Sequence, residues 1–599
     1  MFKVVRKIYS LLDHSERRRF LVLILSMIAV GLIDVAGIAS IMPFMAVVSN
    51  PEVVSSNHYL HWVYQTFGFS SENHFLIFLG LLVFFMLLFS NAMKAMVLWL
   101  DLNFAHFRLY SLSRRLFSSY LSQPYGFFIN QNTSILHKNI LQEVAKFTHE
   151  VLRPCTQIFS RLVAALFIFG LLLVIDPLLA LIIFSSMGTV YLSIYFLAQR
   201  RLVVIGEERF EANAQRSKIA GEAFGGIKDL KILNREAFFF DQFSEHAHKA
   251  ESRMVAHGLF SQLPSFFMEV VAFGGILIIV IYYLVVKQNI GQTLPVIALY
   301  AFAGYRLMPA LQGIFSAASL LRFNLPVLDR LHQDINANPC ARPILSRQQV
   351  PILPFKERIQ LQAVTFSYPG SDCPILKSFD LSIEKNTSIG LVGATGAGKT
   401  TVVDLLLGLF SPDQGQLLVD GMPVKAETMA GWQLNIGYVP QSIFLSDDSL
   451  ANNIAFGVPA DQIDMAAVER AGKIANIHDF VIKQLPNGYQ TPVGERGVRL
   501  SGGQRQRIGI ARALYRDPAV LIMDEATSAL DGITEEVVTQ AIRTLAGKKT
   551  IITIAHRLTT LKDCDLIYVL EEGRIVEQGS YEELSGSSNR FRAMSRSAI

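Results

Sequence analysis

A glycine-rich loop in the C-terminal half of the chain has the residue types and spacing of a phosphate-binding site. It reads GATGAGKT over residues 393–400, and the apolar run Ser388–Val392 before it suits a buried strand. Glycines let successive backbone N–H groups converge on phosphate oxygens, and the start of a following helix adds positive potential. The pattern predicts ATP bound with Mg²⁺, in which Lys399 contacts the β- and γ-phosphates and Thr400 holds the metal. The nucleotide-binding residues predicted here are Gly393, Ala394, Thr395, Gly396, Ala397, Gly398, Lys399, Thr400 and Thr401.

Two carboxylates follow a second apolar run and suit hydrolysis of that nucleotide. The run Ala519–Met523 has strand character and is followed directly by Asp524 and Glu525. Phosphoryl transfer depends mainly on positioning and on neutralising charge, so a carboxylate beside a metal ion is the expected equipment. We therefore expect Asp524 to coordinate Mg²⁺ and Glu525 to be the catalytic residue that polarises the attacking water.

Three further side chains are predicted to face the nucleotide. Gln441, after the run Ile436–Pro440, is expected to reach Mg²⁺ and the attacking water. His556 follows the strand-like run Thr550–Ala555, and its place in the motif order favours a catalytic role at the γ-phosphate over that of a buried structural histidine. Tyr368, which lies 25 residues before the loop, is expected to stack on adenine, with simple packing as the alternative.

A second anion-binding pattern, Leu500-Ser501-Gly502-Gly503-Gln504, starts 107 positions after Gly393. Ser501, Gly502, Gly503 and Gln504 open a predicted helix and can offer a hydroxyl group and backbone N–H groups to a γ-phosphate. Two anion sites in one domain indicate a partner. We expect two copies to pair head to tail as a homodimer, with each copy completing the other's ATP site.

Composition separates the chain into a hydrophobic part and an ordinary soluble part. Hydrophobic residues make up 51% of the chain, which has 42 phenylalanines and a mean hydropathy of +0.36. The formal net charge of only +5 argues against a nucleic-acid-binding protein. The four cysteines have neither paired nor metal-like spacing, which argues against disulfides and zinc.

The N-terminal apolar runs are long enough to cross a membrane. Basic residues are concentrated in the first 19 positions, between Lys94 and Arg161, and between Arg200 and Arg253, and are absent from Ser49–His74. The positive-inside rule then places the N-terminus and the ATPase domain in the cytoplasm, with the chain as a multi-pass protein of the cell inner (plasma) membrane. The first span is expected to remain uncleaved. Six spans are predicted, at about 20–48, 75–100, 152–176, 177–199, 259–287 and 292–322.

The segments between the spans suggest further structure. Long basic stretches are predicted to be helical extensions that reverse near Ser122–Phe128 and Gly221–Gly226, where a helix tip could dock on the ATPase domain or remain a solvated loop. The external segment 57–69 has apolar residues at helical spacing, which suits a helix at the membrane interface or one packed on the protein itself. The domain prediction is a transmembrane domain at 1–330, a proline-rich linker at 331–355 and, at 356–599, a nucleotide-binding domain whose motifs resemble those of the ABC type.

The chain as a whole resembles a six-span ABC exporter half-transporter. The matching motifs are GATGAGKT, Gln441, LSGGQ, MDEATSALD over residues 523–531, and His556. The resemblance implies a six-helix transmembrane domain with long cytoplasmic extensions and an α/β P-loop ATPase domain, working as an ATP-hydrolysing translocase. It also implies that Ser528–Asp531 joins the two ATP sites and that Thr491–Gly497 touches the helix tips.

The stretch Gly225–Ile232 and the aromatic external segment are similar to lipid-linked oligosaccharide flippases of the PglK type. That narrower resemblance implies flipping of a polyprenyl-pyrophosphate-linked glycan. Arg306, inside the sixth predicted span, is the candidate substrate residue because a charge there is costly and usually functional; an ion pair with Glu269 is the alternative.

Export of peptides or amphipathic drugs is the first rival function. A nucleotide-gated channel or regulatory subunit is the second, and the intact Glu525 and His556 argue against it.

Overall fold

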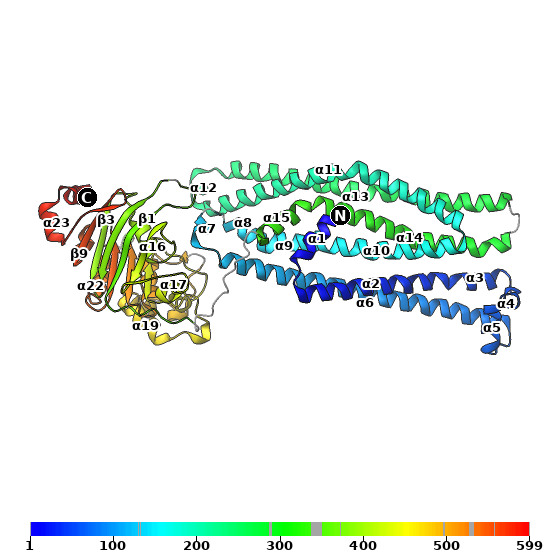
Figure 1. Cartoon of the computed structure of the whole chain (residues 1–599), viewed down its shortest axis with the longest axis horizontal. Coiled ribbons are helices and arrows are strands. Elements are labelled where there is room, and N and C mark those ends of the chain that lie inside the picture. Colours follow the sequence, from blue (N-terminus) through cyan, green and yellow to red (C-terminus); the bar gives the residue numbers. More distant parts are fainter. Residues whose placement is uncertain are drawn as a thin grey trace. The chain divides into compact units, whose positions relative to one another are not determined.

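In a computed structural model, the chain forms two compact units (Figure 1). One comprises Met1–Gln123 and Gln131–Arg342, and the other comprises Pro124–Asn130 and Pro343–Ile599. The residues described are 2–129, 131, 133–286, 290–336, 350–371, 373–494, 497–525, 532–555 and 558–597.

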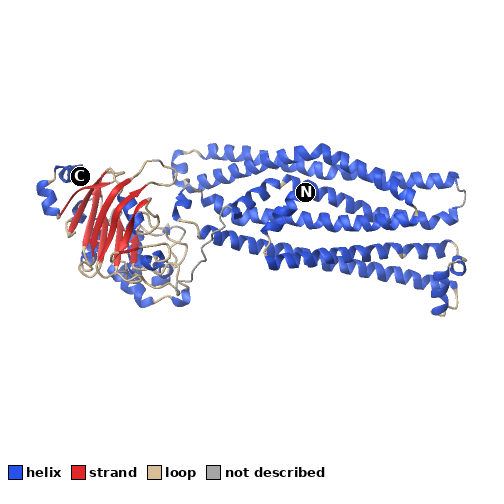
Figure 2. Ribbon diagram, viewed as in Figure 1, coloured by secondary structure: helices blue, strands red, loops and turns tan. Residues whose placement is uncertain are grey.

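The N-terminal unit is built from helices (Figure 2). Within the described residues, each of the six predicted spans lies mostly in helices; residue 287, at the end of the fifth, lies outside the described part of the chain. The α-helices are α1 (Phe2–Leu11), α2 (His14–Ala39), α3 (Ile41–Ser49), α4 (Val53–Ser56), α5 (His58–Thr66), α6 (Glu72–Leu121), α8 (Thr133–Lys138), α9 (Val144–Lys146), α10 (Arg153–Ile175), α11 (Pro177–Gly225), α12 (Ile227–Leu233), α13 (Glu236–Val286), α14 (Ile290–Phe323) and α15 (Leu325–Asn336). Two π-helical turns, η1 (Asn139–Glu143) and η2 (Phe147–Leu152), flank α9.

Several of these helices have the length and composition of membrane spans. Among the described residues, three stretches are long and apolar enough to cross a membrane: His14–Ser49, Glu72–Leu121 and Ile135–Ile175. Two bent helix pairs, in α11 and in α14–α15, raise the number to at most five if each pair is one span. Helix α6 has 50 residues, which at 1.5 Å per residue is about 75 Å and more than twice the thickness of a bilayer core. The long helices therefore continue beyond a membrane, as the sequence predicts.

The external segment packs on the protein through one face of α5. Leu60, Val63 and Tyr64 join a cluster with Phe75 at the start of α6, and the rings of Tyr64 and Phe75 lie 5.4 Å apart, edge to face. The apolar stripe of the helix is therefore covered by the chain itself, which agrees with the second of the two alternatives, a helix packed on the protein. The opposite face exposes Trp62, at 61% of its surface.

The two predicted chain reversals are present. Helix α6 ends at Leu121, and the short helix α7 (Tyr125–Ile129) belongs to the C-terminal unit, where the ring of Tyr125 contacts that of Phe410 at 5.7 Å. The first reversal therefore packs within the C-terminal unit and is not a solvated loop. Helix α11 ends at Gly225, and the second reversal continues through α12 before α13 begins.

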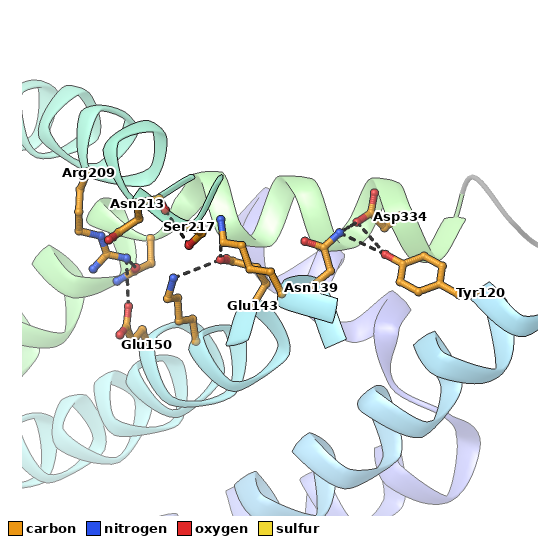
Figure 3. Close-up of polar contacts among 11 residues, drawn as sticks. Tyr120, Asn139, Glu143, Glu150, Arg209, Asn213, Ser217 and Asp334 are labelled. Carbon is orange, nitrogen blue, oxygen red and sulfur yellow. Dashed lines mark hydrogen bonds and ion pairs between the residues drawn. The ribbon is translucent and has the colours of Figure 1, made fainter. Parts of the chain in front are cut away.

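A polar network ties helix α15 to the rest of the N-terminal unit (Figure 3). The amide of Asn139 donates to Oδ2 of Asp334 at 2.9 Å and to the hydroxyl of Tyr120 at 3.2 Å. Further along, Arg209 lies 3.5 Å from Glu150. The predicted linker 331–355 must therefore be shortened, because its first residues belong to α15, which packs through these contacts and ends at Asn336.

The C-terminal unit contains two sheets. One has the order β2-β1-β4-β5 and is antiparallel; the other has the order β10-β9-β3-β8-β7-β6 and is parallel except for β10 at its edge. The strands are β1 (Arg358–Phe366), β2 (Leu376–Glu384), β3 (Ser388–Gly393), β4 (Gln414–Val419), β5 (Met422–Pro423), β6 (Ile436–Val439), β7 (Val520–Asp524), β8 (Thr550–Ile554), β9 (Leu566–Glu571) and β10 (Arg574–Gly579).

The helices of this unit complete its α/β character. Apart from α7, they are α16 (Lys399–Leu406), α17 (Met429–Gln433), α18 (Leu450–Ile454), α19 (Met465–Ile474), α20 (His478–Gln484), α21 (Gly502–Leu514), α22 (Gly532–Arg543), α23 (Tyr581–Ser587) and α24 (Asn589–Ser597). The main core lies between the sheets and α16 and includes Val402, Ile522 and Ile552, all fully buried. The central strands β3 and β7 are buried along nearly their whole length, which is typical of parallel sheets covered on both faces.

Candidate functional site

The carboxyl ends of four parallel strands bring the predicted ATP-site segments together. Strands β3, β8, β7 and β6 lie side by side and point the same way. The phosphate loop therefore starts at the same sheet edge where Asp524 ends β7 and Gln441 follows β6. Such edges are where ligands bind in open α/β sheets. His556, which comes after β8 in the sequence, and Ser528–Asp531 lie outside the described residues.

The phosphate loop has the backbone conformation that its glycines permit. Gly396 and Gly398 have φ values of +85° and +101°, a region that side chains disfavour. The ammonium group of Lys399 lies inside the loop and donates to the carbonyl oxygens of Gly393, at 2.7 Å, and Ala394, at 3.0 Å. Burial lowers the pKa of Lys399, whereas the carboxylates of Glu525 and Asp524 act in the opposite direction. The lysine is thus enclosed among the groups that would surround a phosphate.

The two carboxylates differ in their surroundings. Asp524 ends β7 and is buried, with 7% of its surface exposed. Glu525 has a left-handed backbone, with φ +52°, and its Oε2 accepts a 2.8 Å hydrogen bond from the amide of Gln441. The sequence-predicted Gln441 and Glu525 are therefore in direct contact.

The predicted metal ligands have the chemistry that Mg²⁺ requires. Thr400 offers a hydroxyl oxygen, Asp524 a carboxylate, and Gln441 a carbonyl oxygen, because its amide nitrogen is the group bonded to Glu525. Magnesium prefers oxygen ligands and keeps several waters. These three residues fit the metal, which would neutralise phosphate charge when bound.

Tyr368 lies close to the phosphate loop and makes packing contacts there. Its hydroxyl is 3.2 Å from Oγ1 of Thr401 and donates to Oδ2 of Asp404 at 3.4 Å. Its ring meets the rings of Phe366 and Phe410 edge to face. Burial, aided by the nearby Asp524, raises the pKa of Asp404 to about 6, although the Tyr368 hydrogen bond opposes the shift. Stacking of Tyr368 on adenine stays a prediction.

The second anion-binding pattern starts helix α21, as expected. The hydroxyl of Ser501 accepts from the backbone N–H of Gln504 at 3.2 Å, and the Gln504 side chain accepts from the backbone N–H of Ser501 at 2.8 Å. This reciprocal cap holds the first turn rigid. The N–H groups of Gly502 and Gly503 belong to that turn, where a helix has no carbonyl acceptor for them. Within the segment expected to touch the helix tips, Glu495 and Arg496 lie outside the described residues.

A cavity of about 640 Å³ in the N-terminal unit contains the candidate substrate residue Arg306. Its charged lining residues come from α2, α6, α10 and α14, and sequence reasoning singled out only Arg306 among them. Lys94 and Arg161 lie within predicted spans two and three, and their depth in apolar segments is the sequence signal that could have identified them. The charged residues that line the cavity are Asp34, Lys94, Asp101, Arg161 and Arg306.

Arg306 does not pair with Glu269, contrary to the alternative considered from the sequence. Its guanidinium lies 3.2 Å from Oδ1 of Asp34, which also accepts the ammonium of Lys94 at 2.5 Å. Asp34, on α2, is buried among the helices. Arg306 pairs with Asp34 because predicted spans one, two and six come together where these charged residues lie.

Arg161 is different, because in the described part of the chain it forms neither an ion pair nor a hydrogen bond. Its guanidinium lies against Gly313 of α14, where an added Cβ atom would approach its nitrogen to an impossible 1.3 Å. The glycine therefore makes the space in which this cation sits at the cavity wall.

Comparisons with known proteins agree with the fold. Residues 20–309 match the family described as the ABC transporter transmembrane region, and residues 376–528 match the ABC transporter family. The chain is 32% identical over 486 residues to a protein of Saccharophagus degradans named ATP-dependent lipid A-core flippase, covering 80% of each. It is 36% identical over 375 residues to a Nostoc protein named heterocyst differentiation ATP-binding protein HepA, covering 62% of this chain and 60% of the relative.

A solved structure described as a bacterial Atm1-family ABC exporter with ATP bound has the same fold. The TM-score is 0.75 at 24% identity, over 98% of this chain and 99% of the other. The fold and site define an ATP-hydrolysing membrane transporter with an α/β nucleotide-binding domain. The chain belongs to the ABC transporter family, as a half-transporter of the exporter type. The resemblance stated from the motifs is confirmed at this level; its narrower PglK-type part stays a prediction.

Proposed function

We propose that the protein uses ATP to flip a lipid with a phosphorylated saccharide head group across the cell inner membrane. It would work as a homodimer with two composite ATP sites, and with its N-terminus and ATPase domain in the cytoplasm. The observation that carries the substrate class is the cavity in the N-terminal unit, whose lining has more positive than negative charge.

The charge excess follows from the contacts. Lys94 and Arg306 share the single carboxylate of Asp34, and Asp101 is matched by Arg153, 3.6 Å away. Arg161 then remains as a further positive charge without an acidic partner among the described residues. Charges inside a membrane domain are costly unless they are paired or functional. A phosphate or pyrophosphate group entering the cavity would supply the missing negative charge, and arginine suits it through its fork of donors.

Two substrates share this chemistry. A polyprenyl-pyrophosphate-linked oligosaccharide is the one implied by the resemblance stated from the sequence. A lipid A-core molecule is the one suggested by the names of several relatives. Both join an anionic sugar-phosphate head to long acyl or prenyl chains, so the cavity charge by itself supports the class rather than one member.

The ATP site would drive the transport step. In each site we assign Lys399 and the phosphate-loop N–H groups to the phosphates, Tyr368 to adenine, and Thr400, Gln441 and Asp524 to Mg²⁺. Glu525 would polarise the water, with His556 at the γ-phosphate. Ser501, Gly502, Gly503 and Gln504 of the other copy would close the site.

Reconstituted protein tests this proposal. Proteoliposomes should show ATP-dependent translocation of a labelled polyprenyl-pyrophosphate glycan or of lipid A-core, and no translocation with the Glu525→Gln protein. A short amphipathic peptide and a cationic dye serve as the competing substrates. Robust transfer of the peptide or the dye, with neither phosphorylated lipid moved, would replace the flippase assignment by export of peptides or drugs.

A further inference from the structure

A buried glutamine joins the helix of the second anion-binding pattern to the proposed catalytic carboxylate of the same chain. Gln506 lies in helix α21, two residues beyond Gln504, and exposes only 3% of its surface. Its side-chain amide donates a 3.0 Å hydrogen bond to the backbone carbonyl oxygen of Glu525. Neither the motif order nor the family resemblance assigned a role to this residue.

The contact matters because Glu525 has an unusual backbone. Its φ of +52° lies in the left-handed region, which non-glycine residues adopt only where surrounding contacts enforce it. The backbone N–H of Glu525 donates to the carbonyl of Ile554 in β8 at 3.1 Å. Gln441 holds the side chain and Gln506 holds the carbonyl group. Three separate elements therefore set the direction of the carboxylate.

The element that carries Gln506 also carries Ser501. In the proposed dimer, Ser501 and the glycines after it contact the ATP that is bound by the partner's phosphate loop, whereas Glu525 acts on the ATP bound by its own chain. Helix α21 thus has one end at one ATP site and, through Gln506, contacts the catalytic residue of the other. A capped helix moves as a rigid element, so displacement at its first turn reaches Gln506.

We propose that Gln506 is a positioning residue through which each ATP site senses nucleotide at the other. When α21 is drawn onto a γ-phosphate, Gln506 shifts the Glu525 carbonyl and thereby orients the carboxylate for hydrolysis in its own site. This inference rests on the proposed role of Glu525 and on the proposed dimer. It predicts communication within one chain, by a path made only of described residues.

The test uses full-length dimers of two differently tagged chains, purified by both tags. One chain carries Glu525→Gln, so its site binds ATP without hydrolysis and all turnover comes from the Glu525 of the other chain. In that second chain, Ser501→Ala disturbs contact with the non-hydrolysing site. The effect of Ser501→Ala on turnover is then measured with Gln506 intact and with Gln506→Met, as a double-mutant cycle.

With Gln506 intact, Ser501→Ala is expected to slow turnover at the remote Glu525 by at least about twofold, the low end of coupling between contacting residues. In the Gln506→Met background the same change should have no further effect. Equal slowing in both backgrounds, or none in either, would overturn the proposal. If the Glu525→Gln homodimer still hydrolyses ATP at the wild-type rate, the assigned role of Glu525 fails instead, and the two failures are thus distinguished.

Two controls separate positioning from a simple loss of stability. Gln433 also donates its amide to a backbone carbonyl at 3.0 Å, that of Leu407, and Gln433→Met should leave the effect of Ser501→Ala intact. If Gln506→Met does not assemble, Gln506→Glu replaces it, because an ionised carboxylate of nearly equal size has no donor. ATP binding measured without Mg²⁺ should be the same with Gln506→Met as with Gln506 intact.

Discussion

The guanidinium of Arg306 lies 3.2 Å from the same oxygen of Asp34 that accepts the ammonium of Lys94. One buried carboxylate therefore holds cations from α6 and α14 against α2. The arrangement joins three helices that are remote in the chain and leaves the cavity beside it positively charged. Asp34 is thus important for stability, while Lys94 and Arg306, which share its one negative charge, can also bind an anionic ligand.

Replacement of Asp34 should destabilise the N-terminal unit. In Asp34→Asn, two cations remain close together with no carboxylate, and breaking a buried pair in this way costs about 3 kcal/mol or more. Thermal unfolding of the detergent-solubilised protein should show a clearly lower midpoint. Asp329→Asn is the matched control, because Asp329 pairs with Lys7 at a half-exposed position, where such a loss is below about 1 kcal/mol. Equal midpoints for the two variants would contradict the assigned role of Asp34.

Arg161 should contribute directly to binding of a phosphorylated lipid. Loss of a charge-assisted hydrogen bond is worth about 1.5–3 kcal/mol, so Arg161→Ala should weaken binding by roughly tenfold or more. The concentration of lipid that gives half-maximal stimulation of ATP hydrolysis measures this change. Arg161→Lys should retain part of the affinity, and an uncharged lipid of the same chain length should show no dependence on residue 161. Identical curves for Arg161→Ala and the unaltered protein would remove this residue from the substrate path.

Glu525→Gln should abolish hydrolysis while preserving nucleotide binding. The glutamine side chain can still accept the hydrogen bond from Gln441, so the geometry at the end of β7 should persist, but its amide cannot polarise water as a carboxylate does. Rates of phosphate release should fall by roughly 100-fold or more, the usual scale for a positioned acid or base. Binding of labelled ATP with Mg²⁺ should remain, and Glu571→Gln on the exposed end of β9 provides the control. Rapid hydrolysis by Glu525→Gln would contradict the catalytic assignment.

Asp404 should make the ATPase unit more stable at lower pH. The pKa of Asp404 is raised to about 6 in the folded protein, so the folded state binds more protons than the unfolded state between the ordinary value and about pH 6. The stability contributed by this group is present at low pH and is lost as pH rises through about 6. Asp404→Asn should therefore stabilise the protein at pH 7.5, by about 1 kcal/mol after allowance for solvent screening at a half-buried group.

That advantage should shrink at pH 5, which thermal unfolding at the two pH values can measure. Asp420 is a control of opposite sign. Burial alone would raise the pKa of Asp420, but backbone N–H groups of Arg358, Glu357 and Lys356 outweigh it and hold the pKa below the ordinary value. Its contribution is present at neutral pH and is lost only in acid, so Asp420→Asn should destabilise the protein at pH 7.5. A pH-independent effect of Asp404→Asn would show that its burial is not the cause.

Much of the ATP site follows from local sequence pattern. The phosphate loop, Gln441 and Asp524 each come after a short apolar run, and parallel strands necessarily bring their carboxyl ends to one edge. Ser501 and Gln504 predict a helix start because a capping pair depends only on residues three apart. The membrane helices follow in the same way from the length of their apolar stretches.

Other features depended on the tertiary structure. Whether Arg306 pairs with Asp34 or Glu269 depends on the rotation and depth of packed helices, which apolar length leaves open. The same holds for Arg161, which sits against Gly313 of another helix, and for Gln506, whose acceptor is a backbone carbonyl 19 residues away. The sequence by itself determined the ATP-site motifs and the elements that carry them, since motif chemistry and strand patterns are local properties. Only the tertiary structure decided which charges are neutralised and which remain available, because ion pairing depends on distances between segments that the chain order does not set.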